Sequence, residues 1–152
     1  MDDRYYQNKK QAAHRIYSAQ PLIHSPFFNE DIVLSPEGFQ HLSVSAHGGR
    51  TKEEQIRRFI LLPLGLHVLK TAMTLQAYRK RLASVGTPGS SRGLKGTKIV
   101  QWWAFVALFL NQDIKVRVVV RKVGSGELHF WSVMLSKKPN KRIASKYSAR
   151  AK

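Results

Sequence analysis

The second half of the chain alternates hydrophobic and polar residues, which predicts β-strands. Three runs rich in β-branched and aromatic residues, 98–110, 114–123 and 128–135, are separated by the turn-forming segments 111–113 and 124–126. Short turns between such runs are typical of an antiparallel meander. This part of the chain therefore predicts three neighbouring antiparallel strands.

The middle run has two chemically different faces. Val116, Val118 and Val120 alternate with Arg117 and Arg121. Because successive side chains of a strand point to opposite faces, one face is expected to be apolar and the other to carry guanidinium groups. In the last run, His129, Trp131 and Val133 are expected to oppose Phe130, Ser132 and Met134.

Two helices are expected before these strands. The segment 51–54 is a capping box, in which a threonine hydroxyl and a glutamate carboxylate satisfy each other's free backbone donors. The apolar stripe of the first helix is Ile56, Phe59 and Ile60, and Pro63 is expected to stop or kink this helix. A second helix, with a basic end, is expected to follow. Its apolar stripe is Val68, Ala72, Leu75, Tyr78 and Leu82.

The N-terminal region gives weaker signals. Residues 1–26 form a polar extension or a short helix, and residues 32–34 are a short β-prone run closed by a turn-forming segment. Two alternatives remain for residues 39–46. Their alternation fits a strand, whereas Ser35 as a cap with Pro36 at the first helical position fits a helix.

These elements predict one α+β domain over residues 27–136, with N-terminal helices packed on a twisted four-stranded antiparallel sheet. The glycine-rich stretch 84–97 carries Arg92 and Lys95, and is a candidate to line a binding cleft as a mobile loop. The basic tail 137–152 is expected to stay disordered until it binds an anion.

The absence of cysteine narrows the chemistry. The 152 residues contain no Cys, which excludes a disulfide framework, an iron–sulfur cluster and a cysteine-bearing zinc site. The longest apolar run, 102–110, covers about half of the ~20 residues that a membrane helix needs, and the N-terminus lacks an apolar signal core. We therefore expect a soluble, cytoplasmic protein with no membrane partner.

Positive charge is concentrated in the C-terminal two thirds. Residues 1–54 hold six basic and seven acidic side chains, whereas residues 55–152 hold twenty basic and two acidic ones, a net charge of +18. Such a field attracts polyanions, because Lys and Arg release condensed counterions from phosphates. RNA or another nucleic acid is the expected partner, and an anionic membrane surface or an acidic protein is the alternative.

The sequence lacks the residues that several classes of phosphate chemistry require. Glu53, Glu54 and Asp113 are a poor basis for a two-metal nuclease, which needs several clustered carboxylates. His41 and His47 are six positions apart, which fits neither a helix face nor a strand face as a zinc pair. The sequence also has no phosphate-binding loop of the Walker type. We expect no metal and no cofactor.

Metal-free RNA cleavage fits the residues that remain. It needs a base for the ribose 2′-hydroxyl, cations for the phosphorane and an acid for the 5′-oxygen, which His, Arg and Lys can supply. Each candidate also has a plainer interpretation, as a surface histidine, a solvated helix face, a small strand residue or a core tryptophan. The catalytic candidates are His41, Arg57, Arg117, Arg121, His129 and Ser132. The nucleic-acid-binding candidates are Arg50, Arg92, Lys95, Lys98, Trp102 and Arg117.

The strand pair at the C-terminal end resembles a known family. Residues 115–121, the turn 124–126 and residues 128–134 look like the run "VVVR, short turn, HFxSV" of phage-associated domains in the superfamily of barnase, EndoU, colicin and RelE ribonucleases. Residues 33–35 and 38–42, followed by helices, resemble the front half of those domains. Together the match spans most of the chain.

The resemblance implies a fold and an activity. The implied fold has two helices followed by a four-stranded antiparallel sheet, and the implied activity is metal-independent RNA cleavage that leaves a 2′,3′-cyclic phosphate. His41 would then be an acid or base and Arg121 the arginine that stabilises phosphate charge. Ser132 would be the hydroxyl of the terminal strand and His129 a second proton-transfer group.

The resemblance leaves a catalytic cation and the biological role open. Family members often carry a further basic residue soon after the first histidine, and here Arg50 or Arg57 would fill that place. Such domains often act as toxins on tRNA or mRNA, restrained by an acidic antitoxin or immunity protein. The competing hypotheses are a non-catalytic protein that binds RNA or DNA through Arg92, Lys95 and the basic tail, and a basic module held by an acidic protein.

Overall fold

The computed structural model describes residues 2–45, 48–85 and 96–136 of the chain. In these ranges the fold is α+β, as predicted. The helices are α1 (Asp3–Ser18), α2 (Pro36–Gln40) and α3 (Lys52–Thr71). The strands are β1 (Leu22–Ser25), β2 (Glu30–Val33), β3 (Val44–Ser45), β4 (Gly48–Gly49), β5 (Ala77–Val85), β6 (Gly96–Phe109), β7 (Ile114–Val123) and β8 (Leu128–Leu135). Arg92, Lys95 and the tail 137–152 lie outside the described residues.

Six of the strands form one sheet in the order β1-β2-β8-β7-β6-β5, and β3 and β4 form a separate pair. The predicted meander is confirmed as β6, β7 and β8. The predicted four-stranded antiparallel sheet is wrong, because the β1–β2 hairpin extends the sheet beyond β8 and β2 pairs with β8 in parallel. The sheet is therefore mixed.

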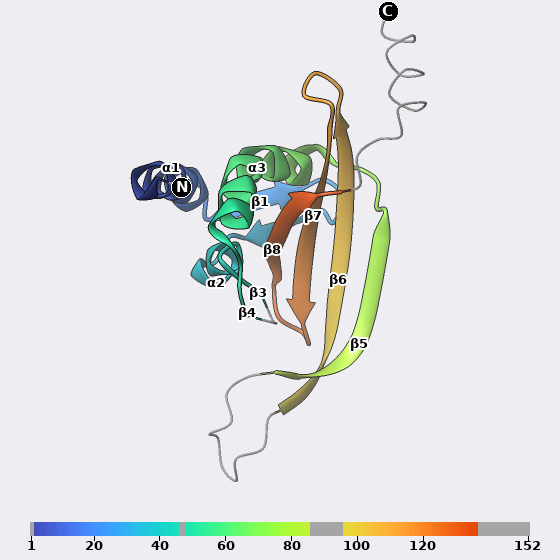
Figure 1. Cartoon of the computed structure of the whole chain (residues 1–152). Coiled ribbons are helices and arrows are strands. Elements are labelled where there is room, and N and C mark those ends of the chain that lie inside the picture. Colours follow the sequence, from blue (N-terminus) through green and yellow to red (C-terminus); the bar gives the residue numbers. More distant parts are fainter. Residues whose placement is uncertain (1, 46–47, 86–95, 137–152) are drawn as a thin grey trace, which may run out of the picture.

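The helices cover one face of the sheet. Figure 1 shows α1, α2 and α3 together on the same side of the long strands. α3 packs on β1, β6, β7 and β8, while α1 packs on α3 and α2 packs on β8. Val116, Val118 and Val120 are completely buried on this side, as their alternation predicts. Gly65 lets α3 approach β8 closely, since a Cβ there would lie 2.7 Å from Val133 Cγ2.

α3 is one continuous helix. Thr51 caps it, and its hydroxyl accepts a hydrogen bond from the amide of Glu54 at 3.2 Å, which is one of the two hydrogen bonds of the predicted capping box. Pro63 lies within the helix on its exposed side, so the amide that proline lacks is missing on the solvent face. The predicted stop at Pro63 is therefore wrong.

β5 occupies the place of the predicted second helix beyond residue 76. Every residue of Ala77–Val85 is paired with β6. Tyr78 and Leu82, which belong to the predicted apolar stripe, are 49% and 70% exposed. Because neither of these two side chains is buried, pairing with β6 outweighs their helical spacing.

Both alternatives for residues 39–46 are present in part, because α2 ends at Gln40 and β3 occupies Val44–Ser45. The Ser35 hydroxyl caps α2 by accepting from the amide of Gly38 at 3.3 Å. A Cβ on Gly38 would lie 2.6 Å from the carbonyl oxygen of Phe130 and 2.6 Å from the Tyr17 hydroxyl. Tyr17 donates to the Ser35 carbonyl oxygen at 2.5 Å, and burial raises the pKa of Tyr17. These contacts hold the N-terminal part of α2 against β8.

A β-bulge in β8 sets the position of Trp131. The register of β7 and β8 shifts between Val119 and Val120, and Trp131 is the residue that the pairing skips. Bulges redirect side chains and interrupt strict alternation. As a result Ser132 and Val133 are both buried, although they are neighbours in the strand.

Candidate active site

His41 lies where the end of α2 meets β8. It is the C-cap residue of α2. Its ring stacks on that of Trp131, with the ring centroids 4.4 Å apart and an interplanar angle of 30°. The imidazole also forms a hydrogen bond with the main chain of Trp131. The bulged tryptophan therefore fixes the orientation of the imidazole.

Two arginines from different elements lie beside His41. Arg50 follows β4, and its Nε donates a hydrogen bond to the His41 carbonyl oxygen at 3.2 Å. Arg121 on β7 lies over the ring of Trp131, with its Cζ 4.1 Å from the ring centroid. Trp131 thus contacts both the imidazole and one guanidinium group.

A third arginine, Arg58, reaches the same place from α3. One of its terminal nitrogens donates to Ser132 Oγ and to the carbonyl oxygen of Val133, each at 2.9 Å. Ser132 is 2% exposed, so its hydroxyl acts here as the acceptor that positions a guanidinium group. α3 and β8 are joined at the site by this contact.

The charges around His41 favour its neutral form. Burial, which is the largest cause, and the positive charges of Arg50, Arg58 and Arg121 together lower the pKa of His41 to about 4. The hydrogen bond to Trp131 acts against this shift. At neutral pH the imidazole is therefore uncharged and is able to accept a proton.

The surroundings of Arg58 and Arg121 disfavour the charged form of their guanidinium groups. Burial and the neighbouring Arg50 lower the pKa of Arg58 to about 10, and Glu54 acts in the opposite direction. Burial also lowers the pKa of Arg121, against the attraction of Glu37. Like charges that are gathered and partly desolvated favour the binding of an anion, because the anion relieves their repulsion.

Two polar atoms of the site have no partner within the described part of the chain. They are His41 Nδ1 and Arg121 Nε, and both are buried. Buried polar groups of native proteins are usually hydrogen-bonded, so an unsatisfied pair points to a ligand. One of these atoms belongs to the neutral base, and the other belongs to a cation.

A cleft opens beside Arg121 and Trp131. Its volume is about 130 Å³, and its lining includes His129, Glu37 and Glu127. His129 and Arg121 are register partners on neighbouring strands. The cleft therefore combines an imidazole, a guanidinium group and two carboxylates.

The structure brings together some of the predicted residues and separates others. Arg121 and His129 line the cleft, and His41 stacks on Trp131, which also lines it. Arg50 contacts His41, and Ser132 is linked through Arg58, but neither lines the cleft. Arg57 is exposed on α3. Lys98 lines a different groove with Lys80. Trp102 and Arg117 line an open groove over β5, β6 and β7.

Sequence reasoning missed Arg58 and the two carboxylates of the cleft. It placed Ile60 on the buried stripe of α3, but this side chain is 51% exposed. If the helix is continued past Pro63, the buried Leu62 and Leu66 become part of the apolar stripe. The predicted buried face then shifts toward Arg58. Glu37 gave only the signal of an acidic residue in the first turn of a helix. Glu127 gave no comparable signal.

Comparisons with protein-family models, with curated proteins and with solved structures gave no match. Within residues 2–45, 48–85 and 96–136, no three His, Asp or Glu side chains gather as metal ligands. No helix in the same ranges is long and apolar enough to cross a membrane. The functional argument therefore rests on the geometry of the site.

Proposed function

We propose that the protein is a metal-independent endoribonuclease that cleaves RNA by attack of the ribose 2′-hydroxyl. The observation that carries this proposal is a neutral imidazole, His41, surrounded by Arg50, Arg58 and Arg121. It supplies a proton acceptor and positive charge at one point, which are two of the three requirements of metal-free phosphodiester cleavage. The resemblance to the barnase, EndoU, colicin and RelE superfamily is consistent with this chemistry.

The proposed step balances protons and bonds as follows. His41 takes the proton of the 2′-hydroxyl while the 2′-oxygen forms a bond to phosphorus. The bond from phosphorus to the 5′-oxygen breaks, and His129, in its protonated form, gives a proton to that oxygen. Arg121 and its neighbouring arginines stabilise the negative charge of the phosphorane. The products are a 2′,3′-cyclic phosphate and a free 5′-hydroxyl.

Substrate binding strengthens the proposed base. The three arginines lower the pKa of the His41 imidazole, in addition to the effect of burial. A phosphate among these arginines offsets their charge, so the pKa of His41 rises when RNA is bound. The imidazole is then neutral in the free protein and more basic in the complex.

The direct test is incubation of the purified full chain with tRNA or an mRNA in EDTA, followed by analysis of the ends produced. Cyclic-phosphate ends that disappear in His41→Ala and Arg121→Ala support the proposal. Arg57→Ala is the matched control, because this arginine is exposed on α3 beside Arg58. Intact RNA with the unmodified protein contradicts the proposal.

The biological role that fits this activity is a bacterial or phage toxin acting in the cytoplasm on tRNA or mRNA. The +18 charge of residues 55–152 suits an acidic antitoxin or immunity protein as its restraining partner. The second candidate function is a non-catalytic protein that binds RNA or DNA, which the open basic groove with Trp102 and Arg117 favours. Retention of intact RNA, unaffected by His41→Ala, is the result expected for that candidate.

A further inference from the structure

One row of side chains crosses four neighbouring strands in register. Arg79 of β5 pairs with Trp102 of β6, Trp102 pairs with Arg121 of β7, and Arg121 pairs with His129 of β8. Residues in register on adjacent strands point to the same face of a sheet. The row therefore leads from the outer strand β5 directly into the cleft of the proposed active site.

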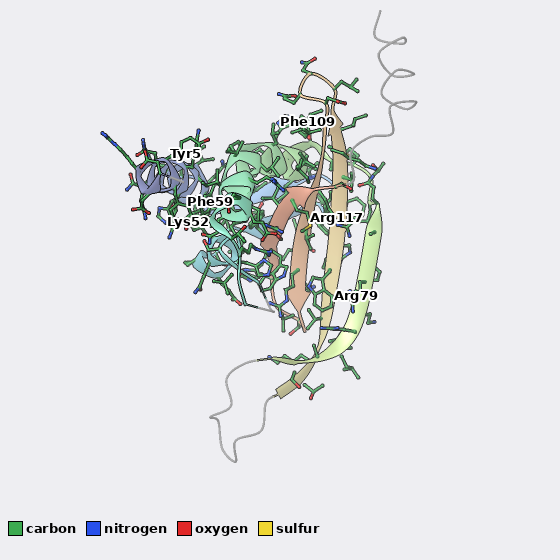
Figure 2. The ribbon with its side chains drawn as sticks, viewed as in Figure 1. Tyr5, Lys52, Phe59, Arg79, Phe109 and Arg117 are labelled. Atoms are coloured by element: carbon green, nitrogen blue, oxygen red, sulfur yellow. The ribbon has the colours of Figure 1, made fainter. Side chains whose placement is uncertain are left out.

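This row lies on the face opposite to the helices. Trp103, the residue after Trp102, packs on the core and stacks edge-on against Phe28 at 5.1 Å. Val120, which precedes Arg121, is completely buried. Since side chains alternate along a strand, Trp102 and Arg121 both start from the face away from the helical layer. The guanidinium group of Arg121 then contacts Trp131 and lines the cleft together with Glu37 of α2. Figure 2 shows Arg79 and Arg117 over the long strands, away from the helices.

Guanidinium groups flank both tryptophans near the row. The Cζ atoms of Arg79 and Arg81 lie 5.7 and 5.4 Å from the ring centroid of Trp102. Arg121 makes the corresponding contact with Trp131 at 4.1 Å. Each indole ring is thus accompanied by at least one cation, which is the combination that binds bases by stacking and phosphates by charge.

The surface between these residues is an open groove with basic and apolar walls. It has a volume of about 460 Å³, and Arg79, Trp102, Arg117 and Met134 contribute to its lining. No acidic residue of the described ranges lines it. Its charge is therefore complementary to a polyanion.

We propose that this groove binds single-stranded RNA and guides it into the cleft at Arg121. A base stacks on Trp102, and Arg79, Arg81 and Arg117 contact the flanking phosphates. A single strand is favoured over a duplex, because only unpaired bases offer their faces to an aromatic ring. This inference deepens the proposed function. It rests on that function in one respect, namely that the bound RNA continues from the groove into the cleft.

Binding is tested separately from cleavage with an oligonucleotide that cannot react. The probe is a fluorescent 12-nucleotide single strand with 2′-deoxyribose throughout, and the comparison is the same sequence as a duplex. Fluorescence anisotropy with the full chain is expected to show tighter binding of the single strand. Trp102→Ala is expected to weaken that binding about tenfold or more.

The chain offers a matched control on the same strand. Lys80 lies between Arg79 and Arg81 and is also exposed, but it pairs with Gln101 and points to the opposite face. Arg79→Ala and Arg81→Ala are expected to weaken binding several-fold, and Lys80→Ala much less. Trp102→Phe, which keeps an aromatic face, is expected to retain most of the binding. Circular dichroism establishes that each variant is folded.

The outcomes separate the two proposals. Loss of single-strand binding in Trp102→Ala, when the unmodified protein releases cyclic-phosphate ends from tRNA, supports both of them. The same loss of binding in a protein that cleaves no RNA supports the groove and overturns the nuclease. Equal affinity for single strand and duplex, or equal effects of Arg79→Ala and Lys80→Ala, overturns the groove. Binding of an acidic peptide in preference to the oligonucleotide also overturns it.

Discussion

The two faces of β7 differ in almost every physical respect although they share one backbone. On the face toward α3, Val116, Val118 and Val120 are completely buried. On the other face, Arg117 lines an open groove and Arg121 lines a cleft. Substitutions on the first face should change the free energy of unfolding, whereas substitutions on the second should change binding and catalysis.

The largest expected effect is on the helix-covered face. Phe130→Ala removes a completely buried ring that packs against Tyr17 at 5.6 Å between centroids. We expect a loss of about 3–5 kcal/mol in the free energy of unfolding, measured in urea. Arg117→Ala, on the open face, is expected to change this energy by less than about 0.5 kcal/mol. Similar losses in both variants would erase the distinction between the faces.

The next effect is on the rate of cleavage. His41→Ala is expected to lower the cleavage rate about 10²- to 10⁴-fold, because the proposed proton acceptor is lost. The measurement is the initial rate of formation of cyclic-phosphate ends in EDTA. His24→Ala is the control, since this histidine lies on β1 with its side chain 61% exposed. A rate unchanged in His41→Ala would remove His41 from the mechanism.

Arg58 sharpens the comparison because it joins α3 to β8 beside the proposed site. In Arg58→Ala, the buried Ser132 hydroxyl and the Val133 carbonyl oxygen lose their common donor. We expect a loss of about 1–3 kcal/mol in stability, measured by urea unfolding. The neighbouring variant Arg57→Ala is expected to stay within about 0.5 kcal/mol of the unmodified protein. Equal losses would mean that the hydrogen bonds of Arg58 do not contribute.

The smallest expected effect is a dependence of stability on pH. The pKa of His41 is about 4 in the folded protein and about 6.5 when unfolded, so the unfolded chain binds this proton first. Stability should therefore fall as the pH is lowered from about 6.5 toward 4. We expect a contribution on the order of 1 kcal/mol between pH 7 and pH 5, after allowance for solvent screening. It is measured as the difference between the unmodified protein and His41→Gln, and a slope identical in the two proteins would contradict it.

The elements that the sequence predicts well are those determined by near neighbours. The helix start capped by Thr51 and the alternation of β7 are local patterns, and both appear in the structure as predicted. β5 is different, because Tyr78 and Leu82 remain largely exposed and do not produce a buried strand face. Its conformation depends on pairing with β6, which lies beyond an intervening segment of the chain.

The sequence predicts only those features of the candidate site that depend on one β-strand at a time. The alternation of β7 was sufficient to place Arg121 opposite the core, and the resemblance pointed to His41. The choice between Arg57 and Arg58 depends on the rotation of α3, which is fixed by its packing on β1, β7 and β8. The contact of Trp131 with His41 depends on a bulge that no local pattern announces.

The parallel pairing of β2 with β8 has a consequence for the synthesis of the protein. Ile32 and Val33 pair with Leu128 and His129. This pairing of an early segment therefore cannot form until β8, one of the last described strands, has been synthesised. Contacts between such distant segments form late, because loop closure is costly in entropy. During translation, α2 and His41 leave the ribosome well before β8 does. The residues of the proposed site therefore come together only after β8 has been made, so the growing chain carries His41 for some time without its contact to Trp131.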